Sequence, residues 1–109
     1  MTVYVDDMRI PYRGMLMCHM IGTDLGELHE MAAQIGIRRR HYQSDHYDAC
    51  QTARTEAIRR GAIPITRQQL AAMRAQAGRT GEMGTPEQAE AWLRAYQRRG
   101  IDREAALHG

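Results

Sequence analysis

The sequence predicts an α/β protein with a small mixed or partly parallel sheet of about four strands, flanked by helices and followed by a helical C-terminal tail. Residues 25–42 and 49–65 repeat one order of elements: a helix, a glycine and a short strand. The chain has 109 residues, of which 43% are hydrophobic, which is enough for one core. We expect a compact domain over residues 1–78 and a helical extension over residues 79–109, packed on that domain or used for oligomerisation.

The N-terminal residues predict two strands with a loop between them. Residues 3–5 are β-branched or aromatic, which favours a short buried strand. Residues 9–14 contain a proline and a glycine and are typical of a turn or loop. Residues 15–21 are apolar except for His19, as expected for a strand buried on both faces.

The first helix is marked at both ends. Asp24 can cap it, and Glu27 three residues later completes a capping box. Gly36 is a typical residue for its end. Residues 37–42 then predict a third strand, which contains three arginines, and residues 44–48 predict a polar loop.

A second helix, a fourth strand and a third helix follow. Residues 49–60 predict a helix that a glycine ends. Residues 62–65 predict a strand that lies at an edge or contains a bulge, because its proline has no N–H to donate. Thr66 begins the third helix, with a glutamine in the capping-box position, and Gly78 ends it.

The tail predicts one more helix. Thr85 and Pro86 form a strong start signal, because proline suits the first helical position. Gly100 is expected to stop this helix, and residues 102–107 add one last turn. We expect this C-terminal helix to provide the contact surface of a homodimer.

Composition excludes several classes of function. All fifteen basic residues are arginines, so chemistry that needs a lysine, such as a Schiff base or a phosphate-loop lysine, is absent. The one serine, Ser44, is not in a nucleophile-elbow setting, which argues against a serine hydrolase. Cys18 and Cys50 lie far apart and are expected to be reduced. The formal net charge of +2 permits a phosphate-bearing partner without requiring one.

The sequence shows no membrane-spanning segment and no export signal. No apolar run approaches the ~20 residues that a bilayer crossing needs. The first residues lack the basic and apolar segments of a signal peptide. We therefore expect no membrane partner and a cytoplasmic location, which is the host cytoplasm if the protein is phage-encoded.

Polar residues follow the predicted strands and indicate a site. In open α/β sheets, ligands bind beyond the carboxyl ends of the strands. Asp6, His46 and Asp48 are the predicted ligands of a divalent cation such as Zn²⁺, Mn²⁺ or Mg²⁺. Because adjacent residues point in opposite directions, Asp6 is preferred to Asp7. His46 and His19 are predicted to be catalytic, as general acid and base.

Basic and aromatic residues surround this set. Arg38, Arg39 and Arg40 are predicted to bind phosphate. Three further residues are predicted to support the site from nearby: His29, His41 and Tyr47. Together they indicate metal-assisted phosphoesterase chemistry on a nucleotide or nucleic acid. The alternative is a non-catalytic phage or bacterial accessory protein that binds a nucleotide, a nucleic acid or a host protein.

Structural roles remain open for the same residues. Asp48 precedes a predicted helix and has Gln51 three residues later, so it can be an N-cap. His19 can be a hydrogen-bonded core histidine, and His29 can pack against the sheet. The three successive arginines can form the solvated face of an edge strand. If all of these hold, the chain is a structural or interaction module.

Five short motifs, in order along the chain, carry a resemblance to a known family. They are Thr2-Val3-Tyr4-Val5-Asp6-Asp7, Cys18-His19-Met20, Glu27-Leu28-His29, His46-Tyr47-Asp48 and Gly61-Ala62-Ile63-Pro64-Ile65. Over roughly residues 2–70 the chain resembles the domain of unknown function 4031 family, small uncharacterised bacterial and phage proteins. The resemblance implies a compact protein, often encoded by a phage or prophage, but no activity. Its hallmark positions correspond to Asp6, His19, His29, His46 and Asp48.

Overall fold

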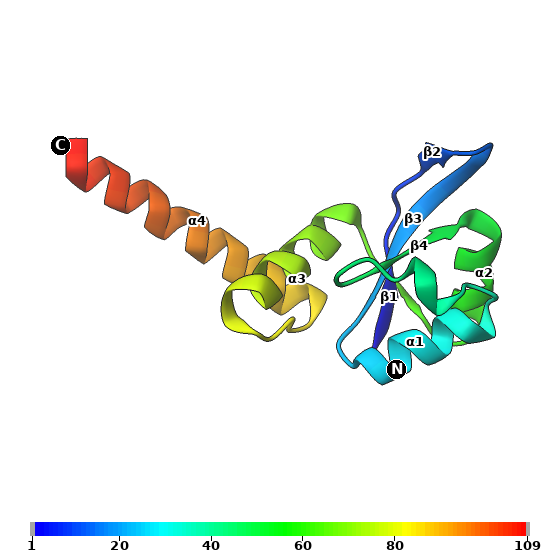
Figure 1. The fold of residues 1–109 in the computed structure, drawn as a ribbon. Coiled ribbons are helices and arrows are strands. Elements are labelled where there is room, and N and C mark those ends of the chain that lie inside the picture. Colours follow the sequence, from blue (N-terminus) through cyan, green and yellow to red (C-terminus); the bar gives the residue numbers. More distant parts are fainter. Residues whose placement is uncertain (1, 109) are drawn as a thin grey trace.

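A five-stranded sheet and four α-helices make up the part of the chain that the computed structural model describes, which is the backbone of residues 2–108 and the side chains of residues 2–103. The elements are β1 (Val3–Val5), β2 (Ile10–Tyr12), β3 (Met15–Gly22), α1 (Leu25–Gln34), the 3₁₀-helix η1 (Arg39–His41), β4 (Tyr47–Cys50), α2 (Gln51–Arg59), β5 (Ile63–Pro64), α3 (Arg67–Thr80) and α4 (Pro86–His108). Figure 1 shows the sheet between α3 on one side and α1 and α2 on the other. The α/β prediction is confirmed.

β3 is the central strand of the sheet. Its first residues pair with β2 and its last residues with β1, both antiparallel, while β4 pairs antiparallel with its middle. β5 is parallel to β1 and lies at the edge, as its proline predicts. Met15, at the hairpin end of β3, is 43% exposed, so this strand is not buried on both faces along its whole length.

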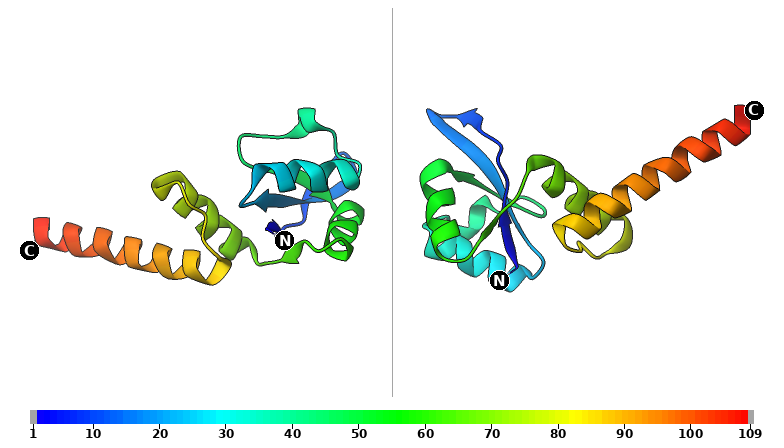
Figure 2. Two further views of the ribbon diagram at one scale, coloured as in Figure 1. Left: turned by 90° about the horizontal axis from the view of Figure 1, so that it is seen from below. Right: turned by 180° about the vertical axis from the view of Figure 1, so that it is seen from behind.

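The two faces of the sheet contact different helices. One cluster of buried residues lies between the sheet and α1 and α2, and includes Val3, Val5, Cys18, Met20, Leu28, Tyr47, Ala49 and Ala57. A second cluster joins the opposite face to α3 and the start of α4, and includes Tyr4, Ile21, Leu70, Met73 and Ala89. α4 packs on α3 at its beginning and then extends away from the sheet (Figure 2).

Residues 9–14, predicted to be a turn or loop, contain both a strand, β2, and the turn of a hairpin. β2 and β3 are joined by Arg13 and Gly14, whose φ angles of 48° and 78° are both positive, as in type I′ turns. Pro11 is tolerated because β2 lies at the end of the sheet and pairs with β3 alone. The proline and glycine therefore mark an edge strand and its turn.

Residues 37–42 do not form the predicted strand. Residues 39–41 form η1, which the N–H of His41 closes on the carbonyl of Arg38 at 3.0 Å. A strand in a sheet turns every second side chain toward the core. Three successive arginines cannot meet that requirement, and all three are exposed here.

Three helix boundaries also differ from prediction. α2 begins after Cys50 because residues 47–50 pair with β3, so Asp48 is a strand residue and not the N-cap. α3 continues through Gly78 to Thr80 and ends at Gly81, whose φ is 82°. α4 continues through Gly100 to its last turn. A glycine inside a helix costs only about 1 kcal/mol relative to alanine, which a long helix tolerates.

The predicted starts of α1 and α3 are confirmed, although the carboxylate of Glu27 accepts hydrogen bonds from Thr2 and does not complete the predicted capping box at Asp24. Asp24 accepts a hydrogen bond from the N–H of Glu27 at the start of α1. Thr66 and Gln69 form a full capping box at the start of α3. In residues 2–108 none of the helices combines the length and apolar character of a membrane-spanning segment.

Candidate metal centre

Three side chains meet on the sheet face that α3 covers in part. His19 lies in the middle of β3, and the strand register places it across from Asp48 of β4. Cross-strand partners point to the same face, and His46, two residues before Asp48, shares that face. One potential ligand atom from each residue lies within 4.8 Å of the others. Strand register thus brings together three residues that the sequence singled out.

A carboxylate holds each imidazole of this cluster at Nδ1. The Oδ2 of Asp6 lies 2.9 Å from Nδ1 of His19, and the Oδ1 of Asp45 lies 2.9 Å from Nδ1 of His46. The two rings lie 5.3 Å apart, centroid to centroid. With Nδ1 engaged, Nε2 of each ring is left for the cluster, and Nε2 of His46 is 3.3 Å from Oδ1 of Asp48. This is the arrangement by which proteins orient metal-binding histidines.

Asp6 supports the site from behind and is not one of the three grouped ligands. It is 1% exposed, and its Oδ1 accepts hydrogen bonds from the N–H groups of His19 at 2.9 Å and Met8 at 3.3 Å. Arg54 donates to its main-chain carbonyl at 2.8 Å. A buried carboxylate needs such partners to offset its lost hydration. Asp6 directly follows β1, and its own N–H donates to the carbonyl of His19 in β3 at 3.1 Å.

Asp45 is the second supporting carboxylate, and the sequence reasoning missed it. Arg74 of α3 donates to it from Nε at 2.8 Å and from Nη2 at 3.2 Å. Partial burial raises the pKa of Asp45, but the hydrogen bonds from Arg74 and His46 outweigh it and hold the pKa below its usual value. Asp45 is adjacent to His46 in the sequence, and this adjacency could have indicated its role. Arg74, which lies 29 residues away, gave no such signal.

The predicted supporting residues divide between two places. His29 and Tyr47 lie away from the cluster, where Nδ1 of His29 is 2.7 Å from the Tyr47 hydroxyl. Burial and the charge of Arg39 lower the pKa of His29. Tyr47 is fully buried in the cluster of residues under α1 and α2, and burial raises its pKa. His41 lies instead in the wall of a cavity beside β4.

The three arginines of residues 38–40 lie outside the cluster. All are exposed, and the guanidinium of Arg39 lies over the ring of Tyr42 at 5.8 Å from its centroid. Cys18 lies on the other face of the sheet, among the buried residues under α1 and α2, and burial, followed by the charge of Asp6, raises its pKa to about 12. The donor set at the sheet face is therefore two nitrogens and one carboxylate oxygen.

This donor set fits a divalent cation. Two ligands at ~2.1 Å from a tetrahedral ion lie about 3.4 Å apart. The 3.3 Å between Nε2 of His46 and Oδ1 of Asp48 matches that spacing, and a ligand atom of His19 lies within 4.8 Å of both residues. Exposed fractions of 19% for His19, 13% for His46 and 38% for Asp48 leave the cluster open on one side. Two imidazoles favour Zn²⁺ or Mn²⁺ over Mg²⁺.

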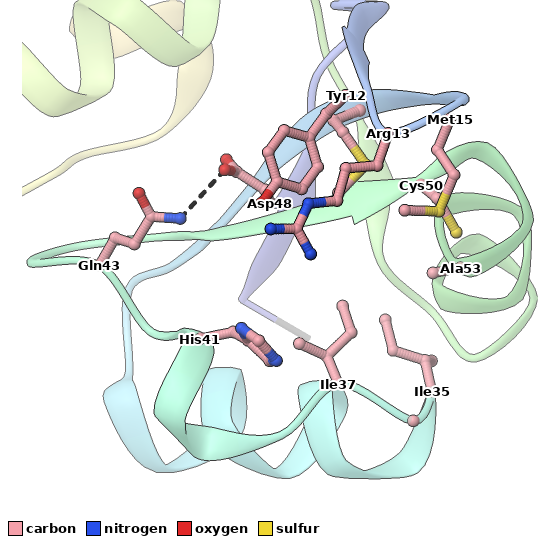
Figure 3. Close-up of a pocket in the computed structure, with 12 residues that line it drawn as sticks. Tyr12, Arg13, Met15, Ile35, Ile37, His41, Gln43, Asp48, Cys50 and Ala53 are labelled. Atoms are coloured by element: carbon pink, nitrogen blue, oxygen red, sulfur yellow. Dashed lines mark hydrogen bonds between the residues drawn. The ribbon is translucent and has the colours of Figure 1, made fainter.

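A cavity of about 610 Å³ lies beside the cluster, at the outer edge of β4. Asp48 belongs to both, since its side chain reaches the cluster and lines the cavity. Figure 3 shows Gln43 donating to Asp48, with Arg13 and His41 in the same cavity.

Comparison with known proteins gives a family but no relative of known activity. No curated protein and no solved structure gives a significant match to the chain. A family match covers residues 3–77, which includes the sheet, all three cluster residues and both carboxylates that hold the imidazoles. The chain therefore belongs to the family described as Protein of unknown function (DUF4031).

Proposed function

We propose that the chain is a metal-dependent phosphoesterase in which His19, His46 and Asp48 bind one divalent cation. The observation that supports it is the convergence of three ligand atoms within 4.8 Å, with a carboxylate on Nδ1 of both imidazoles. A carboxylate at Nδ1 is the usual partner of a metal-binding histidine, because it turns Nε2 toward the ion. Asp6 and Asp45 are the positioning residues in this proposal.

The proposed chemistry is hydrolysis of a phosphate ester of a nucleotide or nucleic acid. Three protein ligands leave coordination positions for a water and a phosphoryl oxygen. His19, His46 and Asp48 would hold the cation, which would lower the pKa of a bound water, so that the water oxygen would add to phosphorus as the ester P–O bond breaks. The departing oxygen takes up a proton, and alcohol and phosphate are released. Arg38, Arg39 and Arg40 are proposed to attract the anionic substrate.

Metal titration tests the proposal directly. Protein freed of metal with a chelator is titrated with Zn²⁺ and with Mn²⁺, and one ion per chain is expected. His19→Ala and His46→Ala should each lower affinity by more than the roughly 10–100-fold that loss of a supporting residue costs. The matched control is His41→Ala, since His41 is exposed and lies outside the cluster. Binding of less than one ion, or equal binding by all variants, contradicts the proposal.

Turnover separates catalysis from binding. Hydrolysis of p-nitrophenyl phosphate should require the cation and should be lost in His46→Ala. Stoichiometric metal binding without turnover of phosphate esters would favour the non-catalytic accessory protein, which the exposed arginines of η1 also suit.

A further inference from the structure

The cavity beside the metal cluster has the size of a small-molecule site. It has a volume of about 610 Å³, within the ~300–1,000 Å³ typical of such sites. It lies between the β2–β3 hairpin, the segment that follows α1, and β4. Much of its wall is apolar, formed by Met15, Met17, Ile35, Ile37, Cys50 and Ala53. A surface of this kind suits the carbon skeleton of a ligand and not an extended polyanion.

Two nitrogen-bearing side chains give the same cavity a site for an anion. Arg13 extends from the hairpin turn across the cavity, toward the segment that carries His41 and Ile37 (Figure 3). Its guanidinium lies 5.3 Å from the centroid of the Tyr12 ring. Among the described residues it forms no ion pair, whereas Arg67 and Arg74 do. A cation held over a cavity without a carboxylate partner favours an anionic ligand.

The cavity and the metal cluster share Asp48. Its Oδ1 faces His46, and its Oδ2 accepts a hydrogen bond from Gln43 in the cavity wall at 3.0 Å. An anionic group held by Arg13 and His41 would therefore share this cavity with Asp48, the residue through which the cavity meets the proposed cation site.

We propose that this cavity binds a small phosphomonoester, with the phosphate at Arg13 and His41 and the organic group on the apolar wall. The proposal assigns a substrate class to the site. Its hydrolysis step rests on the proposed function, whereas the binding of phosphate in the cavity is independent of it. Water adds to phosphorus, the P–O bond to the organic group breaks, and that oxygen takes up a proton. A nucleoside monophosphate has a suitable size, and the faces of its planar aromatic base can pack against the apolar wall.

Binding of inorganic phosphate and of AMP to the full chain tests this assignment. Calorimetric titration should show both ligands binding to the metal-free protein. Arg13→Gln should weaken both by about tenfold or more, because charge-assisted hydrogen bonds are lost. Arg9→Gln is the matched control, since Arg9 is exposed in the same segment and outside the cavity, and it should bind both ligands unchanged. Ile37→Ala should weaken AMP several-fold and leave phosphate unchanged.

The outcomes separate this inference from the metal proposal. Arg13→Gln that binds Zn²⁺ normally but loses phosphate supports the inference. Metal binding with no phosphate or AMP binding, or equal binding by Arg13→Gln and Arg9→Gln, overturns the inference alone. Phosphate binding that depends on Arg13 without any metal binding overturns the metal proposal alone. Steeply salt-dependent binding of an oligonucleotide that requires Arg38, Arg39 and Arg40, with no AMP binding, overturns the substrate class.

Discussion

The two faces of the sheet hold histidines in opposite settings. On the side of α1 and α2, His29 contacts the hydroxyl of Tyr47 and the ring of Tyr42, whose centroid lies 4.8 Å away. On the other side, His19 and His46 each contact a carboxylate at Nδ1 and keep the second nitrogen for a shared cluster.

The difference distinguishes a packing role from a chemical one. A tyrosine hydroxyl and aromatic edges satisfy an imidazole that lies against a core, and lower its pKa through burial. A carboxylate instead makes the far nitrogen a better ligand or base. Residue type alone does not distinguish the two settings, because both His19 and His29 correspond to hallmark positions of the family. The group that contacts Nδ1 distinguishes them.

The largest expected effect comes from removing the buried carboxylate behind His19. Asp6→Ala leaves the N–H groups of His19 and Met8 without an acceptor and should lower the free energy of unfolding by about 3 kcal/mol. The adjacent Asp7→Ala is the control, because Asp7 is half exposed and pairs with Arg67 at the surface. It should cost less than about 1 kcal/mol. Urea unfolding of the metal-free proteins measures both, and equal losses would contradict the assigned role of Asp6.

Two substitutions test whether the α1 side of the sheet affects folding stability and the opposite side affects metal binding. Tyr47→Phe removes the hydroxyl that contacts His29 and should cost about 1 kcal/mol of folding free energy. Its Zn²⁺ affinity should stay that of the unaltered chain. His46→Ala should do the reverse, with little change in urea unfolding and a large loss of Zn²⁺ affinity. If His46→Ala instead unfolds the protein, His46 is a structural residue and the contrast between the faces fails.

The lowered pKa of His29 predicts a pH dependence of folding stability that arises on the α1 side of the sheet. Burial, followed by the charge of Arg39, favours the neutral ring in the fold. The unfolded chain therefore takes up the proton first as pH falls below about 6.5, and folding stability declines over that range. His29→Gln should flatten this decline in metal-free protein, whereas His41→Gln, at an exposed position, should preserve it. Urea midpoints from pH 7.5 to pH 5 measure the slope, and an unchanged slope in His29→Gln contradicts the burial of this ring.

Local signals predicted the starts of α1 and α3 and the first strand well. Caps such as Asp24 and Thr66 act through hydrogen bonds within one turn, so a short window of sequence contains the cause. The strands β2 and β4 were missed, because both exist only through pairing with β3. The segment with three successive arginines was predicted to be a strand, but it does not pair with the sheet.

The site residues were predicted from the rule that ligands bind beyond the carboxyl ends of strands, but these residues are not placed in that way. Strand ends were expected to gather them, yet β3 and β4 are antiparallel and His19 lies in mid-strand. The register, which sequence alone does not fix, sets His19 opposite Asp48. Arg74 and Arg13 were missed because their contribution depends on tertiary placement, from a separate helix and from a hairpin turn.

The smallest expected effect concerns α3, which covers the site face and holds Asp45 through Arg74. Gly78 lies inside this helix, and an added Cβ would meet nothing within 4 Å. Gly78→Ala should therefore raise the free energy of unfolding by about 0.5–1 kcal/mol, through helix propensity alone. Gly81→Ala is the contrasting variant, because the φ of Gly81 is 82° and a side chain there is strained whatever the space. Both variants should bind Zn²⁺ as the unaltered chain does, since Arg74 lies a full turn before Gly78. A change of metal affinity in Gly78→Ala would mean that motion of the whole helix, and not the single contact between Arg74 and Asp45, sets the position of His46.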